Sequence, residues 1–199
     1  MARQIPRSCA PWQWTPMLRM HRFAVAGFAF AFLAQAGCHS APSPGDNTPV
    51  LSLTSASFTG DSIPAKFSCH GSDTSPALQW SAPPAATQSF ALIVDDLDTP
   101  ENFVHWVLYD LPAAARELPE AVTTQPQRAD GSRQGVNDFG NTGYGGPCPP
   151  GSRAHRYRFR LYALDAKLGL PAGATRNQVA EAMQSHILAH GQIVARFQP

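Results

Sequence analysis

Short apolar runs alternate with turn-rich segments along most of the chain after residue 50, and this pattern favours strands over long helices. Residues 90–94 (FALIV) form a continuous apolar run bounded by loops, as expected of a buried strand. Residues 103–111 (FVHWVLYDL) are rich in aromatic and β-branched side chains, which predicts a second strand. Residues 51–58 and 193–197 are weaker strand candidates.

A third strand is predicted at residues 157–165 (YRFRLYALD), where apolar and basic side chains alternate. Because successive side chains of a strand point to opposite faces, Arg158 and Arg160 are expected to share the face away from the core. With Arg153 and Arg156 they form the one local basic cluster. We expect this cluster to pair with acids such as Asp95 and Asp98 and not to contact anionic lipid.

One helix is predicted near the C-terminus. Thr175 and Gln178 have the spacing of a capping box, apolar positions follow at roughly helical spacing as far as Ala189, and Gly191 ends the segment. His186 and His190 would then lie one turn apart, a spacing that can hold a metal ion. We interpret them instead as a helix face, or as cations near the C-terminal end of the helix dipole.

Residues 123–156 form a long turn-rich segment, which is typically functional or disordered. The chain shows no internal repeat and no second core. We therefore expect a single β-rich domain with a few helices.

The first 38 residues have the pattern of an export signal. Arg19 and Arg22 precede an apolar run at residues 23–33, which is too short to cross a bilayer comfortably. Translation is expected to start at Met17 or Met20. The signal ends either in a cleavage site after Ala36, which releases a soluble protein, or in lipidation of Cys38, and the sequence favours neither.

This pattern predicts three parts: an export signal at residues 1–38, a flexible Pro-rich linker at residues 39–49 and a folded domain at residues 50–199. The expected location is the periplasm or the cell exterior, with a membrane-anchored lipoprotein as the alternative.

Charge is divided unevenly between these parts. The formal net charge of +1 combines four arginines in the export signal, which has no acid, with 11 basic and 14 acidic residues after it, a net −3. A mildly acidic domain excludes bulk electrostatic binding of nucleic acid.

Cys69 and Cys148 are the only cysteines after Cys38. In an exported protein they predict a disulfide that closes a loop of about 80 residues. Two free buried thiols are the alternative. No C-x-x-C motif supports a zinc or thioredoxin-type site.

Three polar segments stand out among the predicted strands: Asp95–Pro100, His105 with Trp106, and the Gly- and Pro-rich residues 145–157. His105 interrupts an apolar run, so its imidazole needs a hydrogen-bond partner. We expect Asp96 or Asp98 to accept that bond.

The third polar segment adds further pocket candidates. His155 and Tyr157 are two residues apart and share one face of a strand, and Pro147–Pro150 suits a rigid wall. Together these groups predict a small pocket suited to a phosphate or carboxylate.

These segments resemble the phosphatidylethanolamine-binding protein family, most closely its bacterial, Raf-kinase-inhibitor-like branch. The resemblance covers the chain from Val50 onward. The matching motifs, in order, are CHGSDTSPALQW at 69–80, the D-x-D-x-P stretch at 96–100, His105–Trp106, residues 137–157 and residues 161–165.

The resemblance implies a mainly β fold, in which a large antiparallel sheet packs on a smaller one with peripheral helices. It also implies a shallow pocket for a small anion or a phospholipid headgroup. We expect no cofactor and no metal ion. The residues that match the family's pocket are Asp96 with Asp98 beside it, His105, His155, Tyr157, and Pro147 and Pro149 in the wall. Leu97 departs from the family, which usually has proline between the two acids.

The leading hypothesis is therefore an exported binding protein without catalytic activity. One alternative is an inhibitor of a protease or kinase that acts through an exposed loop, although no residue identifies the target. A hydrolase is the second alternative, but the sequence contains neither a G-x-S-x-G nor an H-E-x-x-H motif.

Overall fold

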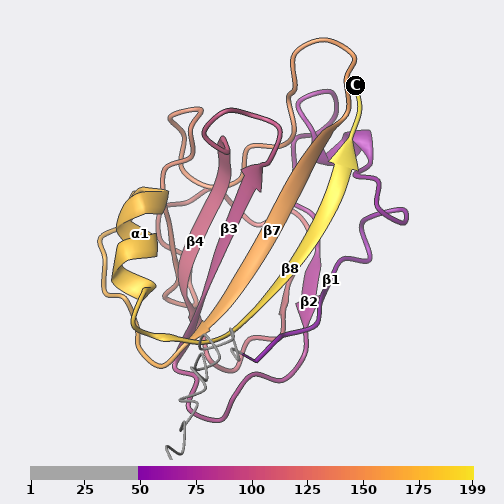
Figure 1. Ribbon diagram of the computed structural model, residues 1–199. Helices are drawn as coiled ribbons and strands as arrows, with labels where there is room; N and C mark the ends of the chain where they lie inside the picture. Colours follow the sequence, from indigo (N-terminus) through magenta and orange to yellow (C-terminus); the bar gives the residue numbers. More distant parts are fainter. Residues whose placement is uncertain (1–48) are drawn as a thin grey trace, which may run out of the picture. The chain divides into compact units, whose positions relative to one another are not determined.

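Two antiparallel sheets form the framework of residues 49–199, the part of the chain that the computed structural model describes (Figure 1). The small sheet has the order β1-β2-β5 and the large sheet the order β6-β4-β3-β7-β8. The strands are β1 (Leu53–Thr54), β2 (Leu78–Trp80), β3 (Ser89–Asp96), β4 (Val104–Pro112), β5 (Glu117–Leu118), β6 (Arg133–Gln134), β7 (His155–Leu164) and β8 (Ile187–Phe197). This architecture confirms the predicted mainly β fold.

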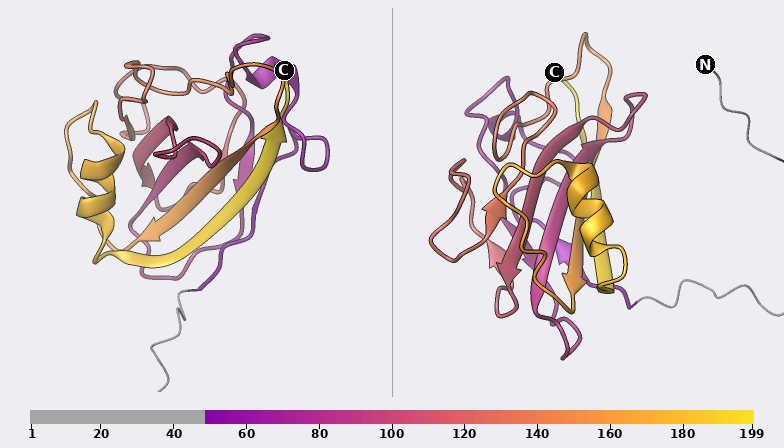
Figure 2. Two further views of the ribbon diagram at one scale, coloured as in Figure 1. Left: turned by 45° about the horizontal axis from the view of Figure 1, so that its top comes forward. Right: turned by 90° about the vertical axis from the view of Figure 1, so that its left-hand side faces the viewer.

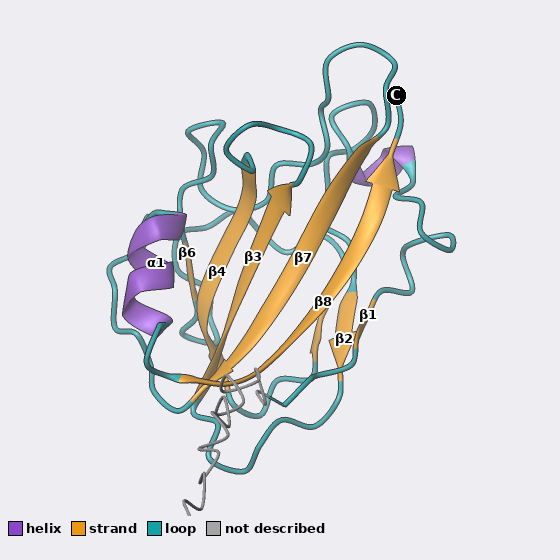
Figure 3. Cartoon of the chain, in the orientation of Figure 1, coloured by secondary structure: helices purple, strands orange, loops and turns teal. Residues whose placement is uncertain are grey.

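The helical elements are few. A 3₁₀ turn spans Ala65–Phe67, and one α-helix, α1, spans Arg176–Met183 (Figure 3). No helix within residues 49–199 is long and apolar enough to cross a membrane. The predicted export signal and the lipidation site Cys38 lie outside the described residues, as does almost all of the predicted linker.

β3 is buried along its whole length because both faces of the large sheet are covered. Phe90 and Leu92 belong to the main core against the small sheet, whereas Ala91 and Ile93 belong to a second cluster that includes Val179 of α1. Figure 2 shows α1 on one face of the large sheet and the small sheet on the other. A strand packed on both faces needs apolar side chains at consecutive positions, which explains the run at residues 90–94.

β7 shows the predicted alternation. Tyr157, Phe159 and Leu161 are buried in the main core, and the side chains between them are more exposed. β7 pairs with β3 on one side and with β8 along nearly its full length on the other. Its polar face therefore lies on the outer side of the sheet, next to α1.

The predicted helix ends earlier than expected. Its N-terminal capping box is present, since Thr175 Oγ1 accepts from the Gln178 backbone and Gln178 Oε1 accepts from the Thr175 backbone. The helix stops at Met183, however, and β8 begins at Ile187. His186 therefore lies in the intervening turn and His190 in a strand, so the prediction that both lie on one helix was wrong. Pairing with β7 outweighs the helical spacing of these residues.

The turn-rich residues 123–156 are held by specific hydrogen bonds, and they include β6. Gln134 is central to them: its Nε2 donates to the carbonyls of Thr123 and Gln125 at 2.5 and 2.8 Å, and its Oε1 accepts from Trp106 Nε1 at 2.8 Å. The loop is thereby fixed to β4, one of the strands that carry the candidate site.

Candidate functional site

Three neighbouring strands bring polar side chains to one end of the large sheet. Asp96 ends β3, His105 is the second residue of β4, and His155 and Tyr157 open β7. Because β3 is antiparallel to both neighbours, its end lies beside the starts of β4 and β7, at the top in Figure 1. The β3–β7 register places Asp96 directly opposite Tyr157.

A cavity of about 190 Å³ opens at this end of the sheet, and we call it the strand-end cavity. Asp96, His105 and Tyr157 supply its polar groups. Phe103 and Phe139 form an aromatic side, and Cys148, Pro149 and Pro150 form a wall, with Thr99 completing the lining. Of the predicted pocket residues, the fold thus gathers Asp96, His105, Pro149 and Tyr157 around one space.

His155 joins the cavity through Asp96. Its Nδ1 donates to Asp96 Oδ2 at 2.7 Å, and both side chains are buried. Asp96 Oδ1 accepts from the backbone N–H of Asp98 at 2.8 Å. The carboxylate is therefore held by one donor on each oxygen, and the imidazole is held with its proton on Nδ1.

His105 has a different partner from the one predicted. Its Nδ1 lies 2.7 Å from the carbonyl oxygen of Gly145, and the backbone N–H of Gly145 donates to the carbonyl of His105 at 2.9 Å. The prediction that Asp96 or Asp98 would accept this bond was wrong, because the loop before β7 packs against β4 and its Gly145 carbonyl is the acceptor at Nδ1. A carbonyl only accepts, so Nδ1 carries the proton and Nε2 is left for a ligand.

Aromatic rings surround the His105 imidazole. The ring centroids of Phe103, Phe139 and Tyr157 lie 5.2, 5.3 and 5.1 Å from that of His105. Burial lowers the pKa of His105 below its usual value, and the Gly145 carbonyl opposes this shift only in part. His105 is consequently neutral at neutral pH, with a lone pair on Nε2.

The Tyr157 hydroxyl is buried and has no hydrogen-bond partner within residues 49–199. Burial raises the pKa of Tyr157, and the charge of the Asp96 carboxylate, together with a weak hydrogen-bond interaction with that carboxylate outside the usual limits of distance or angle, raises it further. The hydroxyl therefore stays protonated and can donate a hydrogen bond. Buried polar atoms are nearly always paired in folded proteins, so an unpaired one at a cavity indicates a place for a ligand atom.

Three predicted pocket residues do not line the cavity: His155, which reaches it only through Asp96, and Asp98 and Pro147. Asp98 accepts from the Arg156 side chain at 2.9 and 3.1 Å, and this hydrogen bonding lowers the pKa of Asp98 to about 2. The carbonyl of Pro147 accepts from the backbone N–H of Cys69 at 3.1 Å. Both residues thus support the loops around the cavity from outside.

The basic cluster behaves largely as predicted. Arg156 pairs with Asp98, and Arg158 pairs with Asp95 through two hydrogen bonds of 2.9 and 2.5 Å. These pairs link β7 to β3 and to the loop that follows it. Arg160, by contrast, has no acidic partner within the described residues.

The proline wall is fixed to the 3₁₀ turn. Cys69 and Cys148 form the predicted disulfide, and the backbone N–H of Gly146 donates to Asp73 Oδ1 at 2.7 Å. The two segments approach so closely that a Cβ on Gly146 would lie 2.3 Å from the carbonyl oxygen of Phe67. Glycine at this position is therefore a packing requirement.

Phe103 and Phe139 are the cavity residues that sequence reasoning missed. Their rings are 4.8 Å apart, although 36 positions separate them in the chain. The available signal was an aromatic residue inside a polar turn, at Phe139 in NDFGN. In the structure this residue is 44% exposed. Spacing alone could not show that the two rings meet.

Comparison with known proteins decides the family. The family model for phosphatidylethanolamine-binding protein matches residues 54–198. The chain belongs to this family. A UPF0098 protein of Aquifex aeolicus is 45% identical over 152 residues, which cover 74% of this chain and 88% of the relative. A UPF0098 protein of Methanothermobacter thermautotrophicus is 44% identical over 136 residues, covering 68% and 89%.

Solved structures of family members agree with this fold. The phosphatidylethanolamine-binding protein homologue CT736 of Chlamydia trachomatis has a TM-score of 0.68 at 36% identity and covers 75% of this chain and 98% of its own. YbcL of E. coli, described as a member of the mammalian family, has a TM-score of 0.66 at 32% identity with the same coverage. The predicted family and fold are thereby confirmed.

Proposed function

We propose that the strand-end cavity binds a small oxyanion or the phosphate-bearing headgroup of a phospholipid, and that the protein acts by binding and not by catalysis. The observation that carries this proposal is the buried Tyr157 hydroxyl, which lacks a protein partner and lies beside His105 and Asp96 in the cavity. A phosphate oxygen at this position would accept its hydrogen bond.

The charges of the cavity determine how a phosphate can enter. Asp96 is held by two donors, and His105 is neutral, so the cavity carries no net positive charge. A bare dianion would therefore meet the carboxylate without a compensating cation. A phosphate avoids this conflict if it binds as the monoanion, whose P–OH group donates a hydrogen bond to His105 Nε2. It also avoids it if His105 takes up a proton on binding.

A zwitterionic headgroup suits the rest of the lining. Phe103 and Phe139 offer aromatic faces near the carboxylate of Asp96, and an ammonium group is attracted both to aromatic faces and to carboxylates. The phosphate of the same headgroup would lie toward Tyr157 and His105. This division of the lining supports phosphoethanolamine-like ligands, in keeping with the family's name.

Calorimetry with O-phosphoethanolamine tests the proposal. His155→Ala removes the donor that holds Asp96, and we expect it to raise the Kd about tenfold, the effect of losing one charge-assisted hydrogen bond. His186→Ala is the matched control, because His186 also donates Nδ1 to a carboxylate at 2.7 Å, that of Asp165, away from the cavity. Equal affinities of His155→Ala and wild type would contradict the proposal.

Export is part of the same proposal. A disulfide persists in oxidising compartments, and the Cys69–Cys148 pair supports residence in one of them. Intact mass analysis of the protein from fractionated cells would distinguish a chain cleaved after Ala36 from one lipidated on Cys38. Recovery of the uncleaved chain in the cytosol would overturn the export proposal. A phosphatase and esterase screen of the same preparation tests the expected lack of catalysis.

A further inference from the structure

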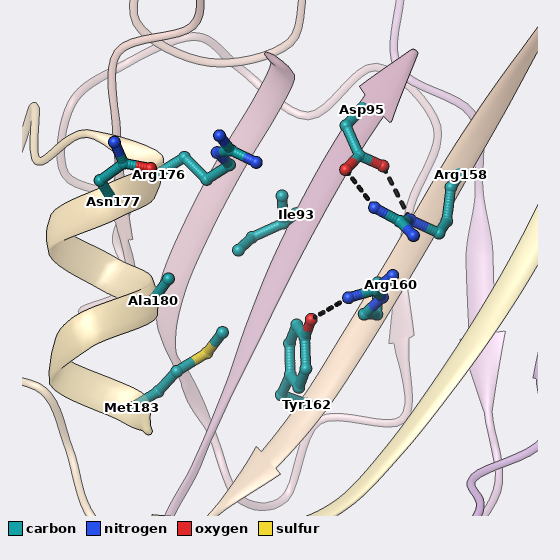
Figure 4. Close-up of a pocket in the computed structure, with 9 residues that line it drawn as sticks. All are labelled: Ile93, Asp95, Arg158, Arg160, Tyr162, Arg176, Asn177, Ala180 and Met183. Atoms are coloured by element: carbon teal, nitrogen blue, oxygen red, sulfur yellow. Dashed lines mark hydrogen bonds and ion pairs between the residues drawn. The ribbon is translucent and has the colours of Figure 1, made fainter. Parts of the chain in front are cut away.

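A second hollow lies on the outer face of the large sheet, between α1 and β7 (Figure 4). Its volume is about 200 Å³. Two of the α1 side chains that line it, Ala180 and Met183, belong to the cluster on the face opposite the small sheet. We call it the arginine hollow, because Arg158, Arg160 and Arg176 all line it. None of its lining residues is shared with the strand-end cavity.

The three arginines differ in how they are paired. Arg158 is held by Asp95 through two hydrogen bonds, and its charge is balanced there. Within residues 49–199, neither Arg160 nor Arg176 has a carboxylate oxygen within 4 Å. The hollow therefore carries two half-buried guanidinium groups with no carboxylate within ion-pair distance.

Tyr162 prepares one of these groups for binding. Arg160 Nη1 donates to the Tyr162 hydroxyl oxygen at 2.9 Å, and the guanidinium carbon lies 5.9 Å from the centre of the Tyr162 ring. The hydroxyl oxygen thus accepts from Arg160, and the hydroxyl hydrogen is left to donate to a ligand. Because the Tyr162 ring is buried in the sheet face, it holds Arg160 in place before any ligand arrives.

Apolar side chains form the floor of the hollow. Ile93 comes from β3, and Ala180 and Met183 come from α1. In Figure 4 the Arg176 side chain extends from α1 toward Ile93, on the side of the sheet that carries Arg158 and Arg160. Cationic groups above an apolar floor suit a ligand that is anionic at one end and apolar at the other. A volume below the usual 300–1,000 Å³ of pockets for drug-sized ligands restricts that ligand to a small one.

Arg176 also borders a neighbouring cavity that contains Glu101 and Asp138. These acids are the competing partners for its guanidinium, although neither lies within ion-pair distance. Arg160 does not border that cavity, and the other hollow that Arg160 lines, beside β8, contains no acid. Replacing Arg160 is therefore the more direct test of the hollow, and replacing Arg176 is the supporting one.

From this arrangement we propose that the arginine hollow is a second binding site, for a small organic oxyanion such as a carboxylate or a phosphate monoester. Arg160 and the Tyr162 hydroxyl beside it bind the charged end, Arg176 adds positive charge from the other side of Ile93 (Figure 4), and the apolar part lies on Ile93 and Met183. The site shares no lining residue with the strand-end cavity, so we expect the protein to bind two ligands at separate sites.

Methionine NMR tests this proposal, because Met183 is the one methionine among residues 49–199 and its side chain lines the hollow. The full chain is labelled with ¹³C-methyl methionine, and Met183→Leu assigns the signal. Sodium hexanoate and phenyl phosphate are titrated separately at constant ionic strength, and sodium chloride is the blank. We expect a saturable shift of the Met183 methyl signal, and the probe with the lower Kd identifies the carboxylate or the phosphate ester as the preferred class.

Arg160→Gln is expected to raise the Kd of the better probe about tenfold, and Arg176→Gln to raise it by a smaller factor, because Arg176 lies on the other side of Ile93. Arg153→Gln is the matched control, since Arg153 is an exposed arginine that does not line the hollow. His155→Ala is expected to leave the Met183 titration unchanged, which separates this site from the strand-end cavity. If Arg160→Gln does not fold, Arg160→Lys replaces it, because lysine keeps the charge and loses the planar fork.

Two results would overturn the proposal. One is the lack of a saturable Met183 shift with both probes up to 0.1 M. The arginines would then be ordinary solvent-exposed groups that bind no ligand in the hollow. The other is a titration that is the same in wild type and in the Arg160 and Arg176 variants. Loss of the Met183 shift in His155→Ala would assign the signal to the strand-end cavity and would also contradict the second site.

Discussion

Removing the Cys69–Cys148 disulfide should lower the stability of the domain far more than it lowers ligand affinity. The bond spans 79 positions of sequence. In the chain-entropy model, opening a loop of this length gives the unfolded chain conformational freedom worth about 4.5 kcal/mol, and measured disulfides typically contribute about 2–4 kcal/mol. For a chain of this size, a loss of about 4 kcal/mol corresponds to a fall in Tm of roughly 8–16 °C.

The wall of the strand-end cavity keeps other attachments when the disulfide is absent. Tyr144 Oη donates to the Phe67 carbonyl at 2.6 Å, and the hydrogen bonds from Gly146 to Asp73 and from Cys69 to Pro147 also join the same two segments. Well below the Tm, these bonds should hold the wall in place. We therefore expect the Kd for O-phosphoethanolamine to change less than threefold.

Urea unfolding followed by tryptophan fluorescence measures the stability change. The comparison uses wild type, wild type in reducing agent, and a variant that carries both Cys69→Ser and Cys148→Ser. The reduced wild type and the double variant should lose the same free energy. A loss below about 1 kcal/mol would refute the reasoning, because it would mean that the disulfide hardly constrains the unfolded chain.

Two further predictions follow from the site and from the loop that supports it. Ligand binding should consume protons, because a phosphate favours the protonated form of His105 and burial keeps the free protein's pKa below its usual value. Affinity should then rise as the pH falls toward and below 6.5, with net proton uptake on binding at neutral pH. Calorimetry in buffers of different ionisation enthalpy measures this uptake, and an equal uptake in His105→Asn would contradict it. Gln134→Leu should cost about 2–4 kcal/mol in urea unfolding, because it leaves Trp106 Nε1 and two loop carbonyls without their hydrogen bonds. A cost below about 0.5 kcal/mol would show that water replaces the amide.

Local pattern predicted the strands well where packing follows directly from alternation. The arginines of β7 alternate with core residues, and the uninterrupted apolar run of β3 reflects coverage of both faces. The end of the helix could not be predicted in the same way. Residues 184–190 fit a helical spacing, but their pairing with β7 depends on residues more than 20 positions away. A tertiary interaction of this kind outweighs local preference.

The candidate site shows the same limit. His105 was identified as a polar residue inside an apolar run and Asp96 as an acid after a buried strand, but their partners depend on strand register and loop geometry. Asp96 meets His155 because β3 and β7 are neighbours, and Gly145 reaches His105 because the loop before β7 folds back over β4. Neither contact follows from sequence spacing. The aromatic side of the cavity was missed for the same reason.

The most direct test of the account is the affinity of Tyr157→Phe for O-phosphoethanolamine. The substitution removes one hydroxyl that has no protein partner, so it should leave the free energy of unfolding unchanged within about 0.5 kcal/mol. If that hydroxyl donates to the ligand, calorimetry should show a Kd about tenfold higher or more, since a hydrogen bond to a charged group contributes about 1.5–3 kcal/mol. An unchanged Kd in the folded variant would contradict the assignment of this cavity as the binding site.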